Sequence, residues 1–112
     1  VHGDLMANPW AGEVGITLDG QARVAKLTLG ALAELEADLG TGTLIELAER
    51  FESGRFSARD LLLVIAAGLR GGGWSGGPGD LRTAEIGGGP TGAVRIAAEL
   101  LARAFTLPGA ES

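Results

Sequence analysis

The sequence has no cysteine and no tyrosine, and it has few aromatic residues of any kind. Its 112 residues include three Phe and two Trp. Without cysteine the chain can form neither a disulfide nor a thiolate metal site, and it has no thiol nucleophile. Because aromatic residues are scarce, the core must be built from Leu, Ile, Val and Ala, and we expect a core that packs helices.

The sequence also has a single histidine, no long apolar run and no stretch typical of a secretion signal. His2 is the only histidine, which excludes triads and metal sites built on histidine. The longest apolar run, residues 61–67, is far shorter than the roughly 18 residues that span a bilayer. Residues 1–5 contain neither a basic region nor an apolar stretch of signal-peptide length. We therefore predict a cytoplasmic protein that does not enter a membrane.

Positive charge is also in short supply. The net charge is -5, and Lys26 is the only lysine. Since proteins bind nucleic acid largely by neutralising phosphates with Lys and Arg, we predict no direct nucleic-acid binding. Residues 1–52 carry nine acids and three bases, whereas residues 53–112 carry five acids and six bases. This asymmetry is typical of a solvated acidic surface, and the alternative is a surface that orients a partner.

What the sequence does have is enough apolar content for one folded domain. Hydrophobic residues make up 46% of the chain and charged residues 21%, which excludes the composition of a disordered protein.

Met6 looks like a natural protein start. We predict a disordered leader at 1–5, a single domain at 6–108 and a tail at 109–112.

The segment from residue 13 to residue 27 predicts a β-hairpin. Apolar and polar residues alternate on either side of Asp19-Gly20, which is a strong turn signal. A two-residue loop would place Leu18 opposite Gln21, whereas a loop one residue longer would place it opposite Ala22. We predict the longer loop, because it puts the apolar side chains of both strands on one face.

After Thr28 the apolar period becomes that of a helix. Leu29 begins an apolar stripe, Gly40 and Gly54 stand where helices end, and Ser/Thr-x-x-Asp/Glu patterns predict capping boxes. The predicted helices cover residues 29–39, 44–53, 58–70 and 90–106, with a short helical turn within 80–86. The third is apolar nearly all round and should be central. The predicted fold class is α+β, mostly α: an N-terminal β-hairpin followed by a compact bundle of about four helices.

Two glycine-rich stretches, residues 68–80 and 87–92, could suggest a phosphate-binding loop. Neither has the lysine of a Walker motif, and both follow predicted helices rather than the strand that a dinucleotide fingerprint requires. We predict instead that Gly71 ends the central helix and that the following glycines form a mobile surface loop. Acid pairs such as Glu34 with Asp38 are typical of solvated helix faces, so we predict no catalytic, metal or cofactor site and no enzyme activity.

Four aromatic residues are the candidate partner-binding residues. Trp74 lies in the glycine-rich stretch, where it either folds back over the core, which we favour, or anchors a partner. Trp10 raises the same question. Phe51 and Phe56 stand five residues apart around a turn. They form either a binding edge or, as we favour, two core residues that bracket a corner between helices.

Several blocks of the sequence resemble a family of small proteins encoded in the gene transfer agents of alphaproteobacteria, which are phage-like particles that package host DNA. The blocks are MANPWAGEV, LTLGALAELE, LAERFESGRFSARD, AGLRGGGW and IGGGP, at residues 6–14, 27–36, 47–60, 67–74 and 86–90. The resemblance extends from about Met6 to Pro108. It implies a relative of phage tail assembly chaperones, which bind the tape measure protein while tail tube subunits gather around it.

The same family is also described as a tail tube protein. Tube subunits of long-tailed phages are largely β-sandwiches, whereas this sequence predicts one hairpin and then helices, so the chaperone is our main hypothesis and a structural tail tube component the alternative. A small nucleotide-binding module or enzyme is a remote alternative. The implied partners are the tape measure protein and tail tube subunits, with no cofactor. An exposed hairpin edge also permits a homo-oligomer.

Overall fold

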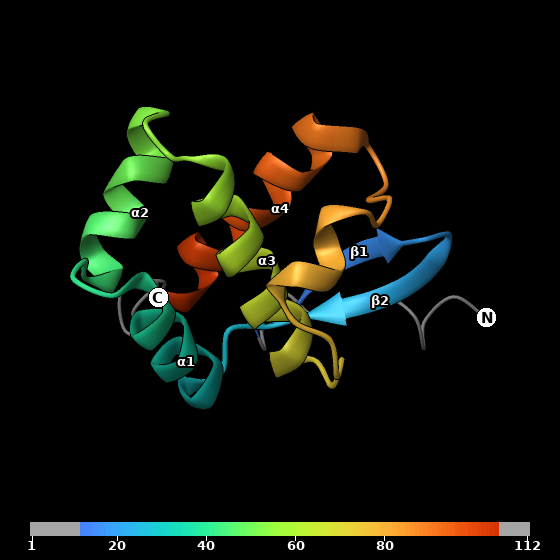
Figure 1. Ribbon diagram of the computed structural model, residues 1–112, viewed down its shortest axis with the longest axis horizontal. Helices are drawn as coiled ribbons and strands as arrows, with labels where there is room; N and C mark the ends of the chain where they lie inside the picture. The colour runs from blue at the N-terminus through green and yellow to red at the C-terminus, as the bar shows by residue number, and fades with distance from the viewer. Residues whose placement is uncertain (1–11, 106–112) are drawn as a thin grey trace, which may run out of the picture.

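The computed structural model describes residues 12–105. It confirms the predicted α+β, mostly α class: an antiparallel hairpin is followed by four α-helices and one 3-10 turn (Figure 1). The elements are β1 (Val14–Leu18), β2 (Gln21–Ala25), α1 (Leu29–Leu39), α2 (Leu44–Ser53), α3 (Ala58–Gly71), η3 (Pro78–Arg82) and α4 (Gly89–Ala104). The predicted leader at 1–5 and tail at 109–112 lie outside the described residues.

The helices begin at the capping residues that the sequence predicts. The Thr28 hydroxyl accepts a hydrogen bond from the Ala31 N–H at 3.1 Å. Thr43 and Glu46 form a reciprocal capping box, and so do Ser57 and Asp60. Each box satisfies two backbone N–H groups that have no partner within the helix. The observed ends of α3 and α4 differ from the predicted ends by one or two residues.

The predicted hairpin register is wrong. Leu18 pairs with Gln21, and Ile16 pairs with Arg23, so the loop has two residues. Asp19 and Gly20 have φ values of 51° and 82°. A type I′ turn requires a positive φ at both of its central residues, and the twist of this turn matches the twist of the two strands. Turn geometry therefore outweighs the matching of apolar faces. The buried face carries Val14, Ile16 and Leu18 from β1, while Ala22 of β2 is exposed.

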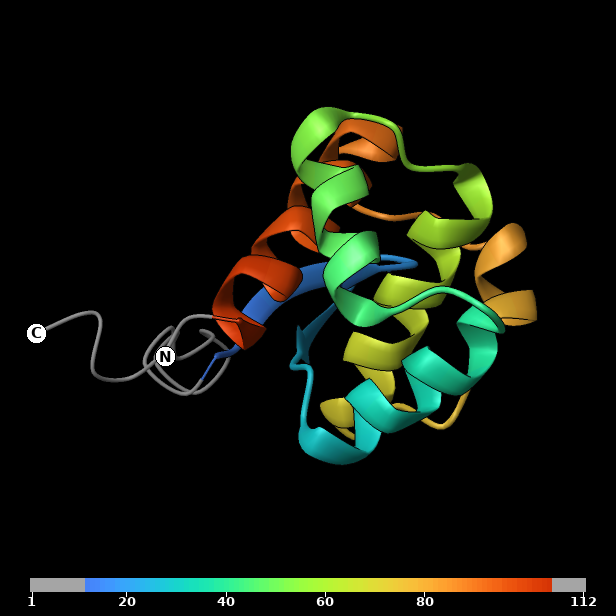
Figure 2. The ribbon, with the colours of Figure 1, turned by 90° about the vertical axis from the view of Figure 1, so that its left-hand side faces the viewer.

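Helix α3 is central, as its apolar sequence predicts. It packs against α1, α4, β2 and η3, and Figures 1 and 2 show it between the other helices and the hairpin. Val64, Ile65 and Leu69 are at most 1% exposed. Gly68 allows α4 to come close, because a Cβ there would lie 2.7 Å from Leu100 Cδ1. The core is aliphatic and extends over both sides of this one helix.

The glycines at the end of α3 are packed more closely than the sequence predicts. Gly71 ends the helix as expected. A Cβ at Gly71 would lie 1.9 Å from the Lys26 carbonyl oxygen, and a Cβ at Gly72 would lie 1.8 Å from the Val24 carbonyl oxygen. The end of α3 therefore passes directly against the backbone at the end of β2, although Gly72 itself remains exposed. Glycine is required there because any side chain would collide with the strand.

The segment between η3 and α4 runs beside the hairpin. The Asp19 N–H donates to the Glu85 carbonyl at 2.7 Å, and the Gly87 N–H donates to the Thr17 carbonyl at 2.9 Å. Leu18 and Ile86 form an isolated β-bridge. These bonds cover the outer edge of β1 near the turn, so this part of the edge is not open to another strand.

Candidate functional site

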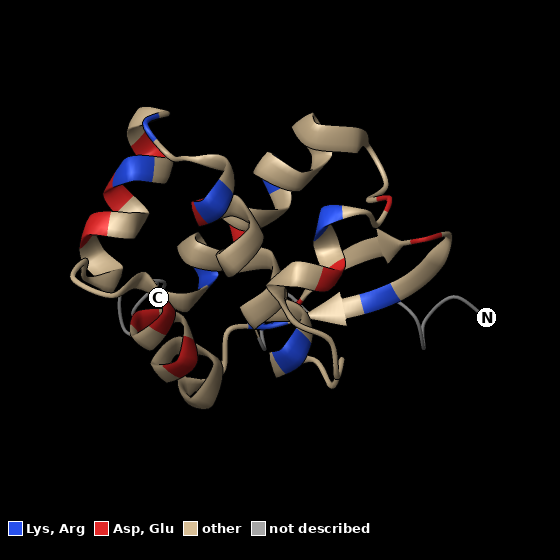
Figure 3. Ribbon diagram, viewed as in Figure 1, with Lys and Arg blue, Asp and Glu red and all other residues tan. Residues whose placement is uncertain are grey.

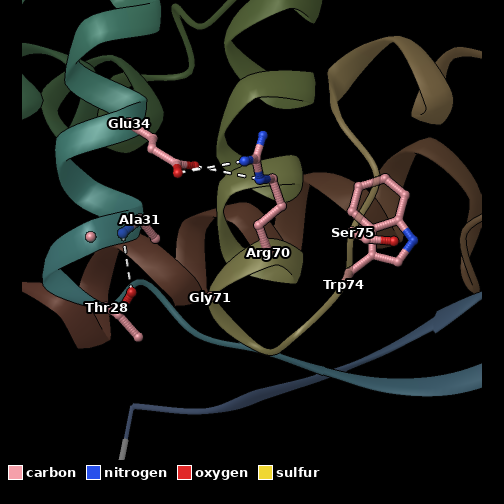
Figure 4. Close-up of a pocket in the computed structure, with 8 residues that line it drawn as sticks. Thr28, Ala31, Glu34, Arg70, Gly71, Trp74 and Ser75 are labelled. Atoms are coloured by element: carbon pink, nitrogen blue, oxygen red, sulfur yellow. Dashed lines mark hydrogen bonds and ion pairs between the residues drawn. The ribbon is translucent and has the colours of Figure 1, made fainter.

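A hollow of about 440 Å³ lies between the start of α1 and the end of α3, and Trp74 forms one of its walls (Figure 4). Thr28, Ala31 and Gly71 line it on the other sides. The Trp74 side chain is half-buried and packs against the core. Its indole therefore packs against the core, the alternative that the sequence favours, and it also faces the hollow.

The glycines around Trp74 hold the indole in this position. The Trp74 N–H donates to the Leu69 carbonyl at 2.9 Å, so the chain turns back onto α3 directly after the helix ends. Gly73 has a φ of 108°, which side-chain-bearing residues rarely adopt. A Cβ at Gly76 would lie 2.3 Å from Trp74 Cζ2. The backbone after Trp74 thus passes directly against the indole ring.

The opposite wall of the hollow is charged. Arg70 projects from α3 and meets Glu34 of α1, with 3.5 Å between Arg70 Nε and Glu34 Oε1 (Figure 4). Both side chains are about half exposed, so the pair contributes little to stability. An aromatic surface beside an arginine is typical of protein interfaces. The hollow therefore combines an aromatic wall with a charged one.

Leu29, at the start of α1, is a large apolar residue that is exposed. It stands between Thr28 and Gly30, which line the hollow, and it is 86% exposed. The sequence places it at the start of the core stripe of α1, and that expectation is wrong. Leu29 is the first residue of the helix, and only Ala31 and Leu35 of α1 are buried. The high exposure of Leu29 is the feature that sequence reasoning missed.

Phe51 and Phe56 lie elsewhere, at the corner between α2 and α3. Their rings stack with centroids 4.5 Å apart and an angle of 5° between the planes. Phe51 is 9% exposed and belongs to the core, whereas Phe56 is half-buried. Trp74 follows the opposite end of α3, so the structure does not bring the predicted aromatic residues into one site. Trp10 lies outside the described residues.

The same corner contains a partly buried ion pair. The Arg50 guanidinium donates from Nε to Asp60 Oδ2 at 3.0 Å and from Nη2 to Asp60 Oδ1 at 3.1 Å. Asp60 also accepts the Ser57 N–H at 2.9 Å. Burial alone would raise the pKa of the Asp60 carboxyl, but the hydrogen bonds from Arg50 and Ser57 outweigh it and hold that pKa below its usual value. The pair joins α2 to the first turn of α3.

Within residues 12–105, no group of three or more His, Cys, Asp or Glu side chains is arranged to hold a metal ion. The backbone carbonyl of Asp38 accepts a hydrogen bond from Arg59 at 2.7 Å, and the Glu34 side chain is paired with Arg70.

In residues 12–105, no helix combines the length and the apolar character needed to cross a membrane.

Comparison with known proteins identifies the family. The family model described as "Phage tail tube protein, GTA-gp10" matches residues 11–106, which is nearly the whole chain. A search of curated proteins and a search of solved structures gave no match. The match supports the gene transfer agent and phage tail resemblance seen in the sequence. The chain therefore belongs to the phage tail tube protein family GTA-gp10 and has a role related to a phage tail.

Proposed function

We propose that this protein is a structural component of the tail tube of a phage-like gene transfer agent. The observation that carries the proposal is the match of residues 11–106 to a family described as a phage tail tube protein. A structural component works by binding its neighbours, and it needs neither a cofactor nor a catalytic group. We also propose that the protein is cytoplasmic and has no enzyme activity.

The hollow beside Trp74 supports a role in binding a tail protein. Leu29 is 86% exposed, and the half-buried Trp74 lies across the hollow from the Glu34–Arg70 pair. Tryptophan and arginine are over-represented among the residues that dominate binding energies. We expect Trp74 and Leu29 to contact the partner directly. We propose Phe56 as a second contact residue, and its ring stacks on the ring of the buried Phe51.

A second candidate is a tail assembly chaperone that binds the tape measure protein. One observation favours it: the described residues contain a two-stranded hairpin and four helices, whereas tube subunits of long-tailed phages are largely β-sandwiches. A chaperone needs an exposed apolar surface for its client, and among the described residues Leu29 and Ile45 are large, apolar and exposed. For both candidates, we also propose that the gene transfer agent is one of those of alphaproteobacteria.

The composition of purified particles distinguishes the two candidates. A tube component is present in many copies in the finished tail, whereas a chaperone leaves before the tail is complete. Quantitative mass spectrometry of purified particles, normalised to the tape measure protein, measures this ratio. Coexpression of this chain with the tape measure protein, followed by a pull-down, tests the chaperone candidate independently.

A further inference from the structure

A second hollow, of about 350 Å³, lies between the hairpin and the start of α4, and two arginines line it. Arg23 comes from β2 and Arg95 from α4, and no acidic residue is part of the lining. Within residues 12–105 neither arginine forms an ion pair, not even with Glu99, which stands one turn after Arg95 on α4. We name this hollow the arginine pocket.

Arg23 lies on the face of the hairpin that packs on the core. It stands opposite Ile16 in the register of the two strands, and residues directly opposite one another share a face of the sheet. Ile16 is 4% exposed. Arg23 Nε is shielded from solvent and has no hydrogen-bond acceptor among the described residues. A donor that loses water without gaining an acceptor costs free energy. An anion in the pocket would supply the acceptor that the fold does not, once the guanidinium turns toward it.

Arg95 adds a second guanidinium from the side of α4. Helical side chains lean toward the N-terminus of their helix, so Arg95 extends toward Gly88, the N-cap two turns earlier. No side chain caps this end, and the first turn holds no acidic residue. The partial positive charge of a helix N-terminus favours an anion. Gly87 and Gly88 also line the pocket, and without side chains they let a ligand come close to the backbone.

The charge of the whole chain favours a small anion over a nucleic acid. The net charge is -5, which repels a long polyanion, and duplex DNA is held by many bases along its length, whereas the pocket supplies two. Half of the acidic residues within 12–105 are on α1 and α2, and Figure 3 shows them away from the hairpin. A small anion at the pocket is therefore remote from much of the negative charge.

We infer that the arginine pocket binds the phosphate group of a small phosphate monoester. Two guanidinium groups match the nearly two negative charges that a phosphate monoester carries at neutral pH, and arginine donates to phosphate through paired hydrogen bonds. A phosphate fills only part of about 350 Å³, and the apolar lining, which includes Ile16 and Ile96, is left for the organic part. Residues 87–92 contain no lysine, so the charge comes instead from two arginines that only the fold brings together. The inference does not depend on the proposed function.

An NMR titration of the purified full-length chain at constant ionic strength tests this inference, with inorganic phosphate and adenosine monophosphate as the probes. The amide signals of Gly87 and Gly88 are expected to move and to saturate, with a dissociation constant on the order of 1 mM. The signals of Gly40 and Gly54, which follow α1 and α2, should stay in place. Unmoved Gly87 and Gly88 signals, equal movement of all four, or weaker binding of adenosine monophosphate than of inorganic phosphate overturns the inference.

Two arginine variants test which side chains hold the phosphate. Arg95 is exposed, so Arg95→Gln leaves the core intact, and it is expected to weaken the binding of both probes at least about tenfold. Arg55→Gln removes the same charge from an exposed arginine outside the pocket and should leave binding nearly unchanged. Equal binding by the two variants overturns the inference. A short DNA duplex that moves the Gly87 and Gly88 signals at a lower concentration of phosphate groups than adenosine monophosphate does also overturns it, in favour of a nucleic-acid contact.

Discussion

Arg50 and Asp60 join α2 to α3 through two parallel hydrogen bonds of 3.0 and 3.1 Å. Asp60 is 6% exposed, and the same carboxylate accepts the N–H of Ser57. One side chain thus completes a capping box and an ion pair. Because the stacked Phe51 and Phe56 rings lie at the same corner, the orientation of α2 depends on both polar and aromatic contacts.

Replacement of Asp60 by Asn is expected to destabilise the fold. The amide retains an acceptor for Ser57, but it leaves the Arg50 guanidinium without its counter-charge. Since Arg50 is about one-third exposed, water offsets part of the loss. We expect the free energy of unfolding in urea to fall by about 1 to 3 kcal/mol. Glu49→Gln is the matched control on exposed α2 surface, and an equal effect of both variants would contradict a special role for the buried pair.

The same pair predicts a loss of stability in acid. The pKa of Asp60 is lower in the folded chain than its usual value, so its contribution is fully present above the usual value near 4 and disappears as pH falls through the folded pKa. The difference in unfolding free energy between wild type and Asp60→Asn is therefore expected to be constant near neutral pH and to shrink in acid. Urea titrations across the acid range measure this difference, which would stay unchanged if the prediction were wrong.

Glycine is required at the end of α3 for steric reasons. Gly71→Ala is expected to destabilise the fold by at least about 2 kcal/mol, because its Cβ would overlap the Lys26 carbonyl and force α3 away from β2. Gly77→Ala is the control: a Cβ at Gly77 meets nothing within 4 Å. Thermal unfolding of both variants measures the contrast. Similar melting temperatures would show that the close contact between α3 and β2 is not present in solution.

Trp74 is expected to contribute to partner binding more than its neighbour Ser75. Both residues line the same hollow, but Trp74 offers a large apolar surface and Ser75 does not. Trp74→Ala should weaken the complex with a tail protein about tenfold or more, and Ser75→Ala should leave it nearly unchanged. Pull-downs with coexpressed tube subunits and with the tape measure protein provide the measurement. Unfolding curves of the free variants separate a loss of binding from a loss of folding.

The local elements of the fold could be predicted because their signals are short-range. Thr43 with Glu46 and Ser57 with Asp60 are three residues apart, and both capping boxes are present. The hairpin turn was also predictable, but its register was not. Two tendencies compete there: matching apolar faces favours a longer loop, whereas Asp19-Gly20 favours a two-residue turn. The turn determines the register.

Contacts between distant parts of the chain could not be predicted from the sequence. The bidentate pair of Arg50 with Asp60 depends on how α2 and α3 cross, and the fit of Gly72 against Val24 depends on where α3 meets the hairpin. The candidate site shows the same limit. Trp74 was identified from its unusual place among glycines, but the exposure of Leu29 was hidden in an apparently regular apolar stripe.

The copy number of this chain in purified particles tests the central claim most directly. The claim is that the protein is a structural component of the tail tube, as membership of the family described as phage tail tube protein suggests. Quantitative mass spectrometry is expected to find many copies for each copy of the tape measure protein. Absence, or only traces, in particles that contain the other tail proteins would contradict the claim and favour the assembly chaperone.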